Sequence, residues 1–186
     1  KVTINLNGKT ITGTDNATGS YGLITINPGA ELAINGDGAI KLTATNNRGW
    51  NAYSSVISNQ RGKLTVNGGT IEHGGGTDMA YAIDNLTNGK GTYAETIING
   101  GAVKSTYRAI RQFLNGVEAE NILTVNGGTI EHLGGTDMAY AIDNLTNGKG
   151  TYAETIINGG TIKSTYRAIR QFLNGTEAQN ILTVNG

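Results

Sequence analysis

Residues 65–123 read TVNGGTIEHGGGTDMAYAIDNLTNGKGTYAETIINGGAVKSTYRAIRQFLNGVEAENIL, and residues 124–182 repeat this stretch with 54 of 59 positions unchanged. The differences between the copies are Gly74/Leu133, Ala102/Thr161, Val103/Ile162, Val117/Thr176 and Glu120/Gln179. Repetition at this level indicates one structural unit stacked on copies of itself. We therefore look for function on a repeated surface rather than in a unique pocket.

The composition favours strands and turns and excludes several classes of function. The chain has 29 Gly, one Pro and 37% hydrophobic residues, and no stretch has the pattern of a helix. Lys plus Arg and Asp plus Glu both number 14, so no basic field favours nucleic acid. No apolar run approaches the roughly 18 residues of a membrane span. We expect no nucleic-acid partner, no membrane insertion and no cofactor.

A finer period appears when the Asn-Gly corners are aligned, at spacings of 28, 32, 32, 27, 32 and 27 residues. These corners are Asn7, Asn35, Asn67, Asn99, Asn126, Asn158 and Asn185. Each interval contains three short apolar runs, one before Asn-Gly, one just after it and one further on. Three short strands per coil, separated by Gly/Asn corners and polar loops, predict a triangular parallel β-solenoid. The 59-residue repeat is then two coils.

The corner sequences resemble those of right-handed parallel β-helix domains of the pectate-lyase-like type. The matching stretches are KVTINLNGKTITG, LAINGDGAIKL, LTVNGGTIEH and TIINGGAVKS, and similar repeats occur in bacterial surface proteins and phage structural proteins. The resemblance implies an all-β, right-handed parallel β-helix and a place outside the cell, on its surface or in a virion. The same fold carries lyases, hydrolases, adhesins and tailspikes, so it does not by itself name an activity.

We expect one β-solenoid domain of about six coils over residues 1–186. Divergent coils occupy residues 1–64, the two repeats occupy 65–123 and 124–182, and residues 183–186 start a further coil. The near identity of the copies indicates a recent duplication within a longer array, or an engineered repeat protein. The chain reads as a piece of something longer, with open terminal coils that could associate end to end with another copy.

Two charge ladders predict the register of neighbouring coils. The position after the second-strand isoleucine reads Lys41, Glu72, Lys104, Glu131 and Lys163. The corresponding position in the third strand reads Ser58, Asp84, Arg111, Asp143 and Arg170. Coils in a parallel sheet lie about 4.8 Å apart, so each charge would face an opposite charge on the next coil. We expect both ladders to form a charge-paired outer face.

Aliphatic columns are expected to fill the interior. The first-strand column is Ile4, Ile34, Val66, Ile98, Val125 and Ile157. The second is Ile11, Ile40, Ile71, Val103, Ile130 and Ile162, and the third is Ile26, Ile57, Ile83, Ile110, Ile142 and Ile169. Amides follow the third column at Asn59, Asn85, Gln112, Asn144 and Gln171. They either form a hydrogen-bonded ladder or cap their own turns.

No catalytic or metal site stands out in the sequence. A polysaccharide lyase or hydrolase needs carboxylates and a basic group converging on one face, whereas the acids here are spread one per strand. His73 and His132 would lie two coils, about 10 Å, apart, too far to share a metal. The remaining candidates lie where the repeat is broken, at Asp15, Asp37, Arg48, Trp50, Tyr53 and Arg61.

The loop TATNNRGWNAYS is the best candidate for ligand binding. Its Trp50 could stack on a sugar ring beside Arg48, Asn51 and Tyr53, or instead fold back to cover the solenoid. Tyr81, Tyr107, Tyr140 and Tyr166 could line a wall for an extended glycan, or stack within the solenoid.

Our hypothesis from the sequence is a non-enzymatic structural or adhesive β-solenoid. It would be a rigid stalk or surface of a bacterial cell-surface or phage virion protein, binding polysaccharide or protein along a strand face. The alternatives are a polysaccharide lyase or hydrolase with catalytic residues in 1–64 or outside this chain, and an engineered repeat protein.

Overall fold

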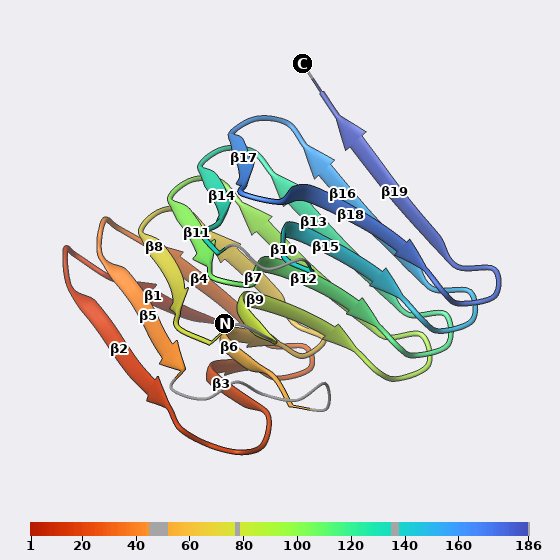
Figure 1. Cartoon of the computed structure of the whole chain (residues 1–186), viewed down its shortest axis with the longest axis horizontal. Helices are drawn as coiled ribbons and strands as arrows, with labels where there is room; N and C mark the ends of the chain where they lie inside the picture. Colours follow the sequence, from red (N-terminus) through yellow and green to blue (C-terminus); the bar gives the residue numbers. More distant parts are fainter. Residues whose placement is uncertain (45–51, 77–78, 135–137, 186) are drawn as a thin grey trace.

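The computed structural model describes residues 1–44, 52–76, 79–134 and 138–185. Three parallel sheets wrap around one core, and the coils stack side by side from the N-terminal to the C-terminal end (Figure 1). Sheet A consists of β1 (Val2–Asn5), β4 (Glu31–Asn35), β7 (Lys63–Val66), β10 (Tyr93–Ile98), β13 (Glu120–Val125), β16 (Tyr152–Ile157) and β19 (Gln179–Val184). Sheet B consists of β2 (Thr10–Asp15), β5 (Ala39–Ala44), β8 (Thr70–Gly74), β11 (Ala102–Ser105), β14 (Thr129–His132) and β17 (Thr161–Ser164). Sheet C consists of β3 (Tyr21–Ile26), β6 (Ser54–Asn59), β9 (Ala80–Thr87), β12 (Arg108–Leu114), β15 (Tyr140–Thr146) and β18 (Arg167–Leu173).

This arrangement confirms the predicted solenoid with three strands per coil. Each strand pairs in parallel with the strand three places before and after it, which gives six complete coils and the additional strand β19. Every described strand lies in one of these three sheets, and no described segment is a helix that could cross a membrane.

The first corner differs from the prediction. Asn5, rather than Asn7, pairs with Asn35 in the register of β1 and β4. The first corner is longer than the later ones: four residues separate Asn5 from β2, whereas two Gly separate Asn67 from β8. The Asn-Gly dipeptide of this coil has therefore moved two residues past the position that its neighbours use.

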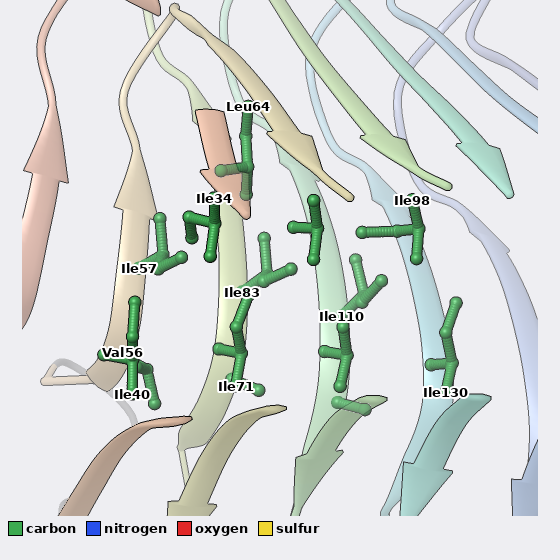
Figure 2. Packing of buried hydrophobic residues seen from close by; sticks show 14 of the residues in the cluster. Ile34, Ile40, Val56, Ile57, Leu64, Ile71, Ile83, Ile98, Ile110 and Ile130 are labelled. Atoms are coloured by element: carbon green, nitrogen blue, oxygen red, sulfur yellow. The ribbon is translucent and has the colours of Figure 1, made fainter. Parts of the chain in front are cut away.

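The interior is filled by the predicted aliphatic columns, except that Ile11 in the first coil is 40% exposed and that the register differs at one position. Isoleucines of successive coils stack directly over one another inside the three sheets (Figure 2). In the first coil, however, Ile24 rather than Ile26 pairs with Ile57, and Ile26 lies opposite Asn59. A slip of two residues keeps the same face of a strand inward, so alternation alone cannot distinguish these two positions. Ile26 is still buried, at the end of the amide column.

The interior amides form a ladder over parts of their column. Asn59 donates to the side-chain oxygen of Asn85 at 3.1 Å, and Gln112 donates to that of Asn144 at 2.8 Å. Asn144 in turn donates to Gln171 at 2.9 Å. Asn59 also accepts a hydrogen bond from the backbone N–H of Gly62 at 3.0 Å, so the ladder and the turn cap coexist.

A second amide ladder runs along the exposed corner between sheets A and B. Each side chain donates to the equivalent residue of the preceding coil at 2.7 to 2.9 Å. Its members are Asn5, Asn35, Asn67, Asn99, Asn126, Asn158 and Asn185. The corner needs glycine: Gly101 has a φ of +80°, and a Cβ there would lie 2.3 Å from the carbonyl oxygen of Gly69. Successive corners therefore pack backbone against backbone.

Candidate functional site

The outer face of sheet C carries three parallel columns of side chains that are unlike those of the other faces. The first alternates aromatic and basic groups, the second acidic and basic groups, and the third Leu and Phe. In order from the N-terminal end the columns are Tyr81, Arg108, Tyr140 and Arg167; Ser58, Asp84, Arg111, Asp143 and Arg170; and Leu86, Phe113, Leu145 and Phe172. The strand register therefore brings carboxylates, guanidinium groups and aromatic rings together on one face.

The acidic and basic column forms bidentate ion pairs between coils. Nε and Nη2 of Arg111 each lie 2.7 Å from an oxygen of Asp84. Nε and Nη2 of Arg170 lie 2.5 and 2.9 Å from the two oxygens of Asp143. A third guanidinium joins this pair, because Nη1 of Arg108 lies 2.7 Å from Asp143 Oδ2.

This ladder has the predicted order but not the predicted environment. The sequence suggested an exposed, charge-paired face, whereas the side chains of Asp84 and Asp143 are 0% exposed and that of Arg111 is 4% exposed. Burial by itself would lower the pKa of Arg111, but Asp84 and the neighbouring Tyr81 outweigh it and raise the pKa above its usual value. Arg111 therefore stays charged inside the cover.

Aromatic rings provide that cover. The Arg111 guanidinium carbon lies 4.2 Å from the ring centre of Tyr81, 4.7 Å from that of Phe113 and 5.1 Å from that of Tyr53. Cations within about 6 Å of a ring face are attracted to it, and more strongly when water is excluded. Burial raises the pKa of Tyr81 to about 12, so its hydroxyl stays protonated at neutral pH.

Arg108 and Arg170 are held in the same way. Arg108 lies 4.5 Å from the ring centre of Tyr107 and donates from Nη2 to its hydroxyl at 2.8 Å. Arg170 lies 4.6 Å from the ring centre of Tyr140 and 5.1 Å from that of Phe172. Sheet C thus carries a preorganised layer of alternating rings and charges.

A groove of about 480 Å³ is open to solvent over this layer. It is lined by Tyr53, Met79, Arg108, Arg111, Phe113, Met138, Leu145, Asn147, Arg170 and Phe172. Most of this lining is apolar, and the charged groups among these residues are all arginines. The two carboxylates lie beneath the groove, paired with those arginines. We take this groove, which we call the sheet C groove, as the candidate functional site.

The structure places the candidates from the sequence in separate regions. Tyr53 lies in the sheet C groove, whereas Arg48, Trp50 and Asn51 lie outside the described residues. Asp37 lines a shallow polar pocket beside sheet B, and Arg61 lines another at the corner between sheets C and A. These described candidates from residues 1–64 therefore do not converge on one site.

The four tyrosines do not form a single wall. Tyr81 and Tyr140 share a column, whereas Tyr107 and Tyr166 each precede the Arg of that column by one residue. Tyr81, Tyr107 and Tyr140 are buried as part of the cover, and Tyr166 is exposed. The residues that sequence reasoning missed are Phe113, Phe172, Met79 and Met138, although the recurring YRAIRQF motif signals an outward Phe next to paired arginines.

The sheet B ladder lies on the outer face and is partly exposed. Lys41 and Glu72 approach to 3.0 Å, and Lys104 and Glu131 approach to 3.2 Å, while Lys163 lies opposite Glu131 in the register. Further ion pairs between coils, which the sequence analysis did not identify, join Lys63 to Glu95, Lys90 to Glu118 and Lys149 to Glu177. Such exposed pairs contribute little stability individually and act mainly on register.

A buried polar cluster lies where β2, β6 and β8 meet. The Ser54 hydroxyl donates to Asp15 Oδ2 at 2.6 Å, and His73 Nε2 lies 2.9 Å from Ser54 Oγ. The three residue types are those of a hydrolase triad, but the serine proton is directed at the carboxylate and all three side chains are buried. We interpret the cluster as structural.

The equivalent His132 is also bonded within the fold. Its Nδ1 lies 3.0 Å from the Ser164 hydroxyl. Within the described parts of the chain, no group of three or more His, Cys, Asp or Glu side chains is placed to hold a metal ion.

Comparisons of the chain with models of protein families, with curated proteins and with solved structures gave no match.

Proposed function

We propose that this β-solenoid is a non-enzymatic structural or adhesive element of a bacterial cell-surface or phage virion protein. It acts outside the cell as a rigid repetitive stalk or surface and binds a polysaccharide or a protein along the outer face of sheet C. The observation that carries the proposal is the unbroken register of three sheets over six coils, with a contiguous groove on one of them.

Rigidity follows from the way in which coils are joined. Neighbouring coils are joined by three parallel strand ladders and the exposed amide ladder, and interior amides and ion pairs add further links between some of them. Six coils at about 4.8 Å each give a body about 29 Å long, and further copies of the repeat would lengthen it in proportion. A scaffold of this kind presents identical surfaces at fixed intervals.

The three outer faces differ in what they offer to a partner. Thr70, Thr129 and the exposed ion pairs of Lys41 and Lys104 give sheet B a polar surface. Sheet A is mixed: Thr65, Thr124 and the Lys63 pair face outward together with apolar side chains such as Ile97 and Tyr152, but no arginine lies in its described strands. Sheet C combines apolar and aromatic lining with arginine, a composition that is common at the centre of protein-binding surfaces.

The alternative of a polysaccharide-active enzyme has its best candidates on the same face. Asp84 and Asp143 lie close to three arginines, but both carboxylates are fully buried and fully engaged by guanidinium groups. A general base must come within hydrogen-bond reach of the proton that it takes, whereas these carboxylates lie beneath the groove with their oxygens bound to guanidinium groups. This favours binding over catalysis.

Two measurements test the proposal. Acidic polysaccharides are incubated with the protein, with and without calcium, and analysed for cleavage, while small-angle scattering measures the shape. We expect no turnover and a rigid body with the dimensions of the stacked coils. Turnover that is lost in the Asp143→Asn variant would instead favour the enzyme, and a flexible chain would contradict the stalk.

A further inference from the structure

We propose that the sheet C groove binds an acidic peptide segment that carries bulky apolar side chains. This inference rests on the proposed function and deepens it, because it names the chemistry of the partner.

Apolar groups in the groove are left partly uncovered by the described residues. Phe113 belongs to an inner strand of sheet C, flanked by Leu86 and Leu145, yet it remains partly exposed. Met138 is 41% exposed at the rim of the same groove. A partner with apolar side chains would cover these groups, and Met adapts its shape to different apolar partners.

The charge of the groove selects an anion. Arg108, Arg111 and Arg170 line it, and the described carboxylates bound to them are those of Asp84 and Asp143. Three guanidinium groups against two carboxylates leave one positive charge in this described set. Arg111 uses Nε and Nη2 for its ion pair with Asp84, so its Nη1 is not needed to hold that carboxylate. A carboxylate is a preferred acceptor for such a group.

The balance of the lining favours a peptide over a polysaccharide. A sugar chain presents many hydroxyl groups, whereas the neutral hydrogen-bonding side chains of the groove are those of Tyr53 and Asn147. The other lining residues, apart from the arginines, are Met, Leu and Phe. Apolar side chains next to carboxylates satisfy both parts of this surface.

The repeat also sets a spacing for the partner. Phe113 and Phe172 are equivalent positions two coils apart, which corresponds to about 9.6 Å along the solenoid. A peptide in the polyproline II conformation presents every third side chain on one face, at intervals of about 9.3 Å. An acidic segment with an apolar residue at every third position would therefore match the spacing of Phe113 and Phe172 along the groove.

The probe follows from this spacing. Three tandem copies of Pro-Phe-Glu, acetylated, amidated and fluorescently labelled, are titrated with the protein and followed by anisotropy. The comparison peptides replace each Glu by Lys, or each Phe by Ala, and labelled oligogalacturonate tests the carbohydrate. We expect only the peptide with Phe and Glu to bind saturably, and we expect added salt to lower its affinity.

The chain offers a fold-compatible variant and a matched control. Phe113→Leu together with Phe172→Leu introduces the residue that the same column already has at Leu86 and Leu145. Tyr152→Leu removes an equally outward and partly buried ring from an inner strand of sheet A. We expect the double variant to bind about tenfold more weakly, through loss of two ring contacts, and the control to bind as the parent does.

The outcomes separate this inference from the function on which it rests. Absence of peptide binding, equal binding of the Lys peptide, or preferential binding of oligogalacturonate would overturn the peptide inference. None of these results would alter the measured shape or the absence of turnover, which test the stalk independently.

Discussion

Nε and Nη2 of Arg111 each lie 2.7 Å from an oxygen of Asp84, so a buried bidentate ion pair joins strands β9 and β12. Breaking a buried pair leaves one charge without a partner, whereas removing both partners does not. The pair is therefore a sensitive point of the fold.

Asp84→Asn should destabilise the protein strongly. It leaves the Arg111 guanidinium buried without its carboxylate, which costs about 3 to 5 kcal/mol of unfolding free energy. Urea unfolding measures the change. The double variant Asp84→Asn, Arg111→Met should lose less unfolding free energy than Asp84→Asn alone. An equal or larger loss would show that the unpaired charge of Arg111 does not cause the destabilisation.

Glu72 tests the exposed ladder of sheet B. Glu72→Gln removes one ion pair with Lys41 and should cost less than about 1 kcal/mol. Glu72→Lys places a cation between Lys41 and Lys104 in the register and should cost more, by roughly 0.2 to 1 kcal/mol for each like-charged pair. Thermal unfolding at low salt measures both, and equal effects would count against the register.

Gly101 tests the packing of the corners. Gly101→Ala should cost about 2 to 4 kcal/mol, because its Cβ would lie 2.3 Å from the Gly69 carbonyl oxygen and its φ is +80°. Gly91 is the matched control, since it has a φ of +60° and no neighbouring atom within 4 Å of an added Cβ. Gly91→Ala should cost only about 1 to 2 kcal/mol. Equal losses of unfolding free energy in the two variants, measured by urea unfolding, would mean that the contact with the Gly69 carbonyl costs nothing beyond the backbone strain.

His132 should make stability depend on pH. Burial lowers the pKa of His132 in the folded state below the value of about 6.5 for an unfolded chain. The unfolded chain therefore binds more protons as the pH falls through that value, and folding stability decreases as the pH falls from 7 to below about 6.5. Urea unfolding across this range should show a smaller decrease for His132→Gln. An unchanged slope would assign the pH dependence to other groups.

The sequence was sufficient for the fold because one physical rule repeats through it. Alternating charges at Lys41, Glu72 and Lys104 admit a single stacking order, and the structure has that register. The prediction went wrong at Asn7 and Ile26, both in the first coil. No repeat supports the alignment there, and a shift of two residues leaves the inward face unchanged.

The candidate site was harder to predict because burial of a polar column depends on what covers it. Glu72 and Asp84 look alike in the sequence, because each is an outward acid that directly follows an inward isoleucine. Tyr81 and Phe113 cover the Asp84 column, whereas comparable rings are missing beside Glu72 in the described part of sheet B. Tyr53 was expected to act with Trp50, but its ring lies beside Arg111, which belongs to a coil further along the chain. A periodic pattern gives the register of a column but not the cover above it.

The alternation of charge from coil to coil also limits how such an array can change in length. Removing the single coil β10–β12 would set Glu72 against Glu131 and Asp84 against Asp143, and would bury two carboxylates side by side. Removing 59 residues leaves every junction with the partners it already has. Recombination between gene copies can therefore shorten or extend this protein only in whole steps of two coils, because any other step places like charges opposite each other at the new junction.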